Sequence, residues 1–121
     1  MSIPSRVLGS GMSQLSTVSI CGDGVDDVVA AGTSAGNATQ LTHVYNSIDT
    51  APVGSGVKLP PTEMGEIIFI TNSGANSIKV YPHESTSVIN QIANAECKKD
   101  HSIICWAVSN TMWYTLTGTK V

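Results

Sequence analysis

Short segments of alternating apolar and polar residues, separated by turn residues, make up most of this chain. Residues 41–48 and residues 77–81 both alternate in this way. A period of two is typical of a β-strand with one buried face. Seven or eight such segments recur, at a spacing of about 8–12 residues that is common in all-β domains. The sequence therefore predicts an all-β fold, either an antiparallel β-sandwich or jelly-roll-like domain or a small barrel.

Two of the segments, residues 66–71 and 101–108, are apolar on both faces. Such strands are typical of the interior of a sheet, so we expect both to be central strands. Trp106 and Cys105 lie in the second segment and are expected in the core. Trp113 alternates with threonines, which predicts a half-exposed face.

Two hairpins are predicted from turn residues between strands. Residues 72–76 include Gly74, which can adopt a positive φ, and Asn110 follows Ser109 between the last two strands. The weaker segments are expected to form short strands at residues 57–59 and 86–93 and an irregular link at residues 94–100.

The N-terminal part of the chain lacks this periodicity. Pro4, Gly9 and Gly11 interrupt its apolar residues, so we expect residues 1–15 to form an extended arm, which is either a frayed terminus or a segment that becomes ordered on a neighbouring subunit. Residues 16–21 alternate like a strand, and residues 22–40 suggest a loop with one brief element. The expected organisation is an arm over residues 1–15 and a single β domain over residues 16–121.

Charged residues are scarce and small polar residues take their place. Only 12% of the residues are charged, whereas Ser, Thr, Asn and Gly fill 45 of 121 positions. Long salt-bridged helices are excluded by this composition, and short strands joined by tight turns are favoured. The net charge of −3 and the single adjacent basic pair, Lys98 and Lys99, argue against nucleic acid as a partner.

Neither a membrane segment nor a secretion signal is expected. No apolar run approaches the roughly 18–20 residues of a membrane helix, and the first residues lack the apolar centre of a signal peptide. We expect synthesis in a cytoplasm and no membrane partner. Three widely spaced cysteines (Cys21, Cys97 and Cys105) indicate free thiols rather than a disulfide framework or a zinc site.

Candidate catalytic and metal-binding groups are weak. Residues 32–36 match the G-x-S-x-G pattern around Ser34, but a strand follows where a hydrolase needs a helix. Asp23, Asp26 and Asp27 do not have the spacing of a calcium loop, and His101 with Cys105 lacks a third orienting group. We expect no enzyme activity, no catalytic residue, no metal and no cofactor.

Several segments resemble a known family. The runs Gly56 to Pro60 and Ile67 to Pro82, the pair Ile89 and Asn90, and the ending Trp113 to Leu116 are similar to segments of small structural proteins of tailed bacteriophages. The opening Ile3 to Gly9 is similar to the arm of capsid decoration, or cement, proteins of this kind. Together these segments cover most of residues 1–12 and 56–117. Where family members have a small-residue turn, this chain has residues 95–100, so the role of that loop is open.

The resemblance implies a β-sandwich or jelly-roll module on the outside of a capsid, as a homotrimer that clamps neighbouring major capsid subunits. An apolar arm on a domain without catalytic groups suits such assembly, because it enlarges the contact area of each subunit. We expect the arm to contact the capsid, with Arg6 pairing to an acidic patch, through Ile3, Pro4, Arg6, Val7, Leu8 and Met12. A receptor- or carbohydrate-binding module of a head or tail fibre, using its aromatic residues, is the alternative.

Overall fold

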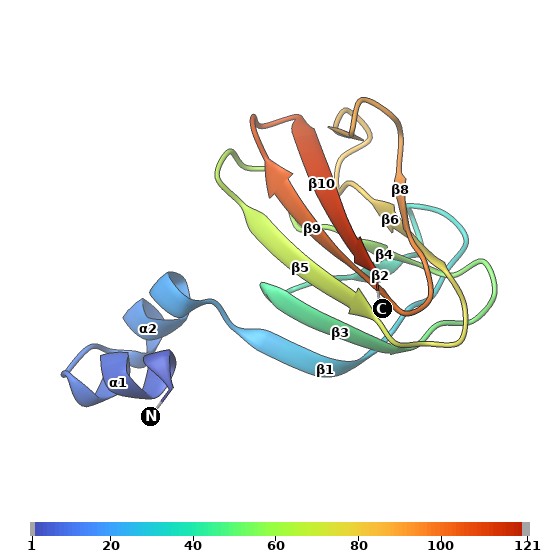
Figure 1. Cartoon of the computed structure of the whole chain (residues 1–121). Coiled ribbons are helices and arrows are strands. Elements are labelled where there is room, and N and C mark those ends of the chain that lie inside the picture. The colour runs from blue at the N-terminus through green and yellow to red at the C-terminus, as the bar shows by residue number, and fades with distance from the viewer. Residues whose placement is uncertain (1, 120–121) are drawn as a thin grey trace.

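A two-helix hairpin leads into a β domain built from two sheets (Figure 1). The structure is a computed structural model that describes residues 2–119, apart from the side chain of Ile20. Within these residues the helices are α1 (Ile3–Gly9) and α2 (Gln14–Cys21). The strands are β1 (Gly24–Val29), β2 (Thr39–Gln40), β3 (Tyr45–Thr50), β4 (Gly56–Lys58), β5 (Ile67–Asn72), β6 (Ile78–Tyr81), β7 (Val88–Ile89), β8 (Ala95–Cys97), β9 (His101–Ala107) and β10 (Met112–Thr119).

The first six strands alternate between the two sheets. The larger sheet has the order β1-β3-β5-β9-β10-β7 and the smaller has the order β2-β4-β6-β8. The odd-numbered strands β1, β3 and β5 pair in parallel, as do β2, β4 and β6. The chain therefore winds through successive coils, the arrangement of a short β-solenoid. In each sheet equivalent positions of the coils stack, as Thr39, Val57 and Val80 do.

The fold is β-rich, as predicted, but the expected antiparallel pairing is wrong for much of the domain. Among the described strands, only the pairs β5–β9, β9–β10 and β6–β8 are antiparallel. The hairpin predicted at residues 72–76 is also wrong, because β5 and β6 lie in different sheets. Gly74 is required there by close packing: a Cβ at this position would lie 2.6 Å from the Cβ of Ala51. Alternation identifies the face of a strand and not its partner.

One hydrophobic core lies between the inner faces of the two sheets. The larger sheet contributes Ile70 and Ile103, the smaller contributes Val57 and Val80, and all four are fully buried. Burial of each such side chain stabilises the fold by about 1.5–3 kcal/mol. The strands predicted at residues 66–71 and 101–108 are both central in the larger sheet, as expected.

The burial of the two tryptophans is the opposite of what the sequence predicts. Trp113 is fully buried, and Trp106 is half-buried on the outer face of the larger sheet. Trp113 pairs with buried Ala107, whereas Trp106 pairs with Tyr114. Residues 101–108 are apolar on both faces, so the sequence pattern did not show which face lies inward. Of the two residues of this segment that were expected in the core, Cys105 is buried and Trp106 is not.

The N-terminal arm is helical, so the prediction of an extended arm over residues 1–15 is wrong, as is the strand predicted at residues 16–21. Each helix begins at a serine cap: the N–H of Ser5 donates to Ser2 Oγ and the N–H of Ser16 donates to Ser13 Oγ. Such caps satisfy backbone donors at the start of a helix. Helix α2 crosses the predicted boundary at residue 15, and the first strand begins at Gly24.

Candidate interaction surfaces

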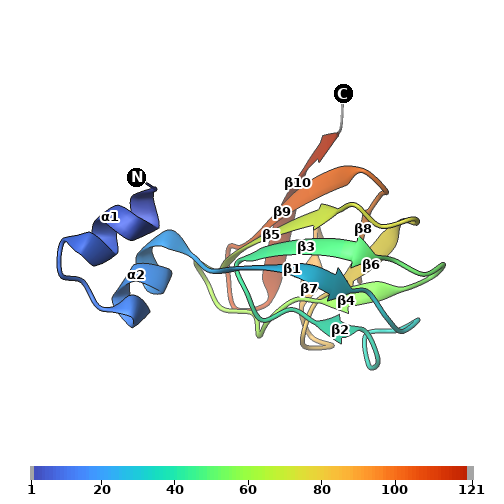
Figure 2. The ribbon, with the colours of Figure 1, turned by 90° about the horizontal axis from the view of Figure 1, so that it is seen from below.

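The α1–α2 hairpin projects from one end of the β domain (Figure 2). No residue of α1 is buried, and Ile3 and Leu15 are 66% and 76% exposed. Among the predicted arm residues, Leu8, Met12, Pro4 and Arg6 are likewise exposed, whereas Val7 is half-buried. Arg6 is the only charged residue between positions 1 and 22. The structure thus places the predicted contact residues on a protruding apolar element, although a helical one.

The root of the hairpin is held against the larger sheet. Helix α2 ends at Cys21 and is capped by Gly22, whose φ is 79°, and a Cβ there would lie 2.8 Å from the Tyr45 ring. Next to it, the carboxylate of Asp23 accepts a hydrogen bond from the N–H of Val44, and the Asp23 carbonyl accepts one from Tyr45. These contacts attach the chain directly after the hairpin to the start of β3.

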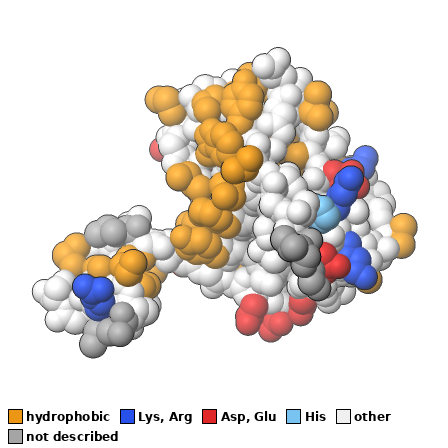
Figure 3. Space-filling view, in the orientation of Figure 1, with side chains coloured by type: hydrophobic (Ala, Val, Ile, Leu, Met, Phe, Trp, Pro, Cys, Tyr) orange, Lys and Arg blue, Asp and Glu red, His pale blue; other side chains and the backbone are white. Residues whose placement is uncertain are grey.

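A second exposed apolar surface covers the outer side of the larger sheet, and we call it the apolar face. Its side chains form two rows that run across adjacent strands. The first row consists of Tyr45, Phe69, Ile104 and Leu116, and the second consists of Ile67, Trp106 and Tyr114. In Figure 3 hydrophobic side chains form a band over this side of the sheet that reaches the root of the hairpin.

Two aromatic rings of the apolar face pack against each other. The rings of Tyr45 and Phe69 stack with centroids 4.8 Å apart and an interplanar angle of 23°. Ile67 and Leu116 remain 46% and 63% exposed. Sequence reasoning missed this surface because a strand that is apolar on both faces was interpreted as buried on both. The available signal was the excess of large apolar residues at alternate positions of the last two strands.

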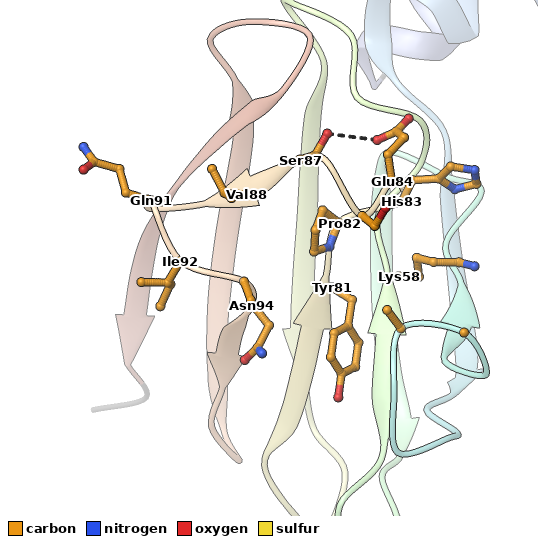
Figure 4. A pocket seen from close by; sticks show the side chains of 14 residues that line it. Lys58, Tyr81, Pro82, His83, Glu84, Ser87, Val88, Gln91, Ile92 and Asn94 are labelled. Carbon is orange, nitrogen blue, oxygen red and sulfur yellow. Dashed lines mark hydrogen bonds between the residues drawn. The ribbon is translucent and has the colours of Figure 1, made fainter.

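A groove beside the smaller sheet has a volume of about 600 Å³. Figure 4 shows Lys58, Tyr81, Gln91 and Asn94 along it. Glu84 also lines the groove, but its carboxylate accepts hydrogen bonds from Thr62 and Ser87. Burial acts to raise the pKa of Glu84, and these hydrogen bonds outweigh it, so the pKa lies below its ordinary value.

Acidic side chains gather at the edge strand of the larger sheet. The register of β1 shifts between Val25 and Val28, and Asp27 within this bulge has a φ of 61°. A hydrogen bond with Asp49, together with repulsion from Asp26 and Asp49, raises the pKa of Asp27. Asp23 lies apart, 4.0 Å from the His43 imidazole. The described residues contain no group of three side chains placed to hold a metal ion.

The remaining candidate residues do not form a nucleophilic site. Ser34 lies in an exposed loop, and its hydroxyl donates to the amide oxygen of Asn37 rather than to a base. Burial raises the pKa of the Cys105 thiol to about 12, and His101 contacts the carbonyl of Lys99 through Nδ1. Low thiolate content makes Cys105 a poor nucleophile.

The segment at residues 94–100 is more regular than predicted. It forms β8 and then a tight turn in which the N–H of His101 donates to the carbonyl of Lys98. Asp100 takes the positive φ of this turn, 62°. The two lysines of this turn are exposed at the end of the β domain.

Comparison with protein families, curated proteins and solved structures gives no match to this chain. Within residues 2–119, no helix is long and apolar enough to cross a membrane.

Proposed function

We propose that this chain is a capsid decoration protein of a tailed bacteriophage, located on the exterior of the virion. In this role it binds the outer surface of the head and clamps neighbouring major capsid subunits. The observation that carries the proposal is the α1–α2 hairpin, whose apolar side chains have no core of their own to enter. The sequence resemblance to phage decoration proteins supports the same role.

The hairpin supplies the contacts with the capsid in this proposal. Ile3, Leu8 and Met12 are the exposed anchors, and Arg6 pairs with an acidic group of the capsid protein. Burying large apolar side chains drives association, since each removes apolar surface from water. The two sheets act as a rigid, sandwich-like body that carries the hairpin.

Many copies on one particle explain how a small protein stabilises a shell. A ligand that binds only the assembled state shifts the equilibrium towards assembly. Several linked contacts add avidity, because binding of one copy of an oligomer raises the effective concentration of the others. We expect a homotrimer to provide this multivalency.

Cosedimentation with capsids that lack this protein tests the proposal. The full chain is expected to bind saturably, and a variant carrying Ile3→Glu and Leu8→Glu is expected to bind about tenfold or more weakly, since it places charge in an apolar contact. Val53→Glu is the matched control, because Val53 is 84% exposed in a turn of the β domain. Equal binding of the hairpin variant and the control would rule out the hairpin as the capsid anchor.

A carbohydrate- or receptor-binding module remains the second candidate, favoured by the groove and by the half-buried aromatic pair Trp106 and Tyr114 on the outer side of the larger sheet. Aromatic rings beside polar groups suit sugars, because each ring offers an apolar surface. Binding to a glycan array that is lost in Trp106→Ala would support this candidate. Trp113→Ala is unsuitable for this test, since Trp113 is buried.

A further inference from the structure

We propose that the apolar face is the surface through which copies of this chain contact one another. The inference rests on the proposed function for its expectation of several copies, and it assigns the contact to the outer side of β3, β5, β9 and β10. An exposed patch of several adjacent large apolar side chains marks an interaction site in most proteins. Tyr, Trp and Phe are enriched in such contacts, and all three occur here.

The uncharged surface is large enough to form the central part of a contact with a domain-sized partner. Beyond the two apolar rows, a third row of small polar residues crosses the same four strands and consists of Ser47, Thr71, Ser102 and Gly118. Four strands about 4.8 Å apart and three rows about 7 Å apart give roughly 400 Å² in projection. That area is about half of the roughly 800 Å² that each partner contributes to a standard interface. Projecting side chains and the surrounding rim supply more contact area.

The distribution of charge favours a second copy as the partner. None of the outward-facing residues in the three rows is charged. Where copies meet around a rotation axis, residues close to the axis approach their own counterparts, so like charges there would repel and an uncharged patch avoids this repulsion. The edge of the same sheet carries Asp26, Asp27 and Asp49, and copies that met there would repel. In Figure 3 acidic side chains lie below and beside the hydrophobic band and not within it.

The position of the hairpin connects this contact with capsid binding. The hairpin leaves the domain at one end of the apolar face and projects past it (Figures 1 and 2). Copies related by cyclic symmetry lie at one level along the rotation axis. A ring formed through the apolar face would therefore present all hairpins at the same level, free to contact the capsid. A capsid subunit that binds the projecting hairpin does not have to contact the apolar face, so both contacts can form at the same time.

Light scattering after size-exclusion chromatography, over a range of concentrations, tests the inference on the full chain. The wild-type protein is expected to be a cyclic oligomer, with three copies as the expected number. Ile67→Lys and Leu116→Lys are expected to weaken association by about tenfold or more, because each places an unpaired charge in an apolar contact. Both side chains are largely exposed in the single chain, so circular dichroism and the Tm should report an intact fold.

Two matched controls test whether the contact between copies lies on the apolar face. Val53→Lys adds the same charge at a site on the domain remote in sequence from the face, and Leu15→Lys adds it on the hairpin, where Leu15 is 76% exposed. Both variants are expected to form an oligomer of the same mass as the wild-type protein. A monomeric wild-type protein, or loss of the oligomer in Leu15→Lys but not in the face variants, overturns the inference.

Capsid binding separates the two proposals. An intact oligomer that fails to bind capsids would remove the proposed function and leave the contact between copies in place. A monomeric wild-type protein whose capsid binding is lost in Leu116→Lys would assign the apolar face to the capsid protein and overturn the inference.

Discussion

Trp113 donates its indole N–H to the hydroxyl of Thr62, 2.9 Å away, in the buried interior of the β domain. The Thr62 hydroxyl in turn donates to the carboxylate of Glu84 at 2.7 Å, and the N–H of Thr62 donates to the same carboxylate. The largest buried side chain is thus linked through one threonine to a carboxylate at the groove. Buried polar groups need such partners, because an unpaired donor is costly.

Replacing Thr62 with valine is expected to destabilise the protein by about 1–3 kcal/mol, since the indole N–H of Trp113 loses its acceptor while remaining buried. Urea unfolding followed by tryptophan fluorescence measures the change. Thr117→Val, at an exposed position of β10, is the control and should change the free energy of unfolding by less than about 0.5 kcal/mol. Equal effects of the two substitutions would contradict the role of the hydroxyl.

The pH dependence of stability should report Glu84. Its folded pKa lies below the ordinary value of 4.5, so its contribution is present above that value and is lost as the pH falls through the folded pKa. We expect Glu84→Gln to lower the free energy of unfolding at pH 7 and to have a smaller effect at pH 3. A difference between wild type and variant that is the same at both pH values would show that ionised Glu84 contributes nothing.

Gly74→Ala is expected to destabilise the protein by about 1–3 kcal/mol through overpacking. The added methyl group would meet the Cβ of Ala51 at 2.6 Å and its backbone nitrogen at 2.8 Å, so two loops of the solenoid would have to separate. Gly118→Ala is the control, because a Cβ there meets nothing within 4 Å. Thermal unfolding should separate the two variants, and a stable Gly74→Ala would show that the loops adjust freely.

The three thiols should differ in reactivity. Burial raises the pKa of Cys97 to about 11 and that of Cys105 to about 12, whereas Cys21 is only half-buried at the end of α2. At pH 8 we expect iodoacetamide to modify Cys21 first and the other two only after unfolding, since the thiolate is the reactive form. Mass spectrometry of the labelled native protein measures this order, and rapid labelling of all three would contradict the burial of β8 and β9.

Strand positions were predictable from the sequence to a greater extent than their pairing. The segments around Ile70, Val80 and Ile103 were located correctly because each buries its inner side chains at a period of two. Their partners depend on contacts distant in the chain: β5 pairs with β3 and β9 rather than with β6, which follows it. Local turn residues such as those around Gly74 did not show that the chain crosses between sheets.

The candidate surfaces were predictable only in part. Ile3 and Leu8 were identified as exposed anchors, but the caps at Ser2 and Ser13 that make this segment helical were not recognised, because glycines and Pro4 suggested extended chain. The apolar face was missed altogether. A sequence in which Ile103 and Ile104 are both apolar does not reveal that only Ile103 is covered.

The bulge in β1 affects whether neighbouring molecules can join edge to edge. A solenoid ends in an open strand edge, which is a template on which another strand can add without limit. Here the register shift at Asp27 interrupts that edge, and carboxylates line it. Both features disfavour growth by strand addition at this end, so closely packed molecules are expected to stay separate units instead of fusing into fibrils.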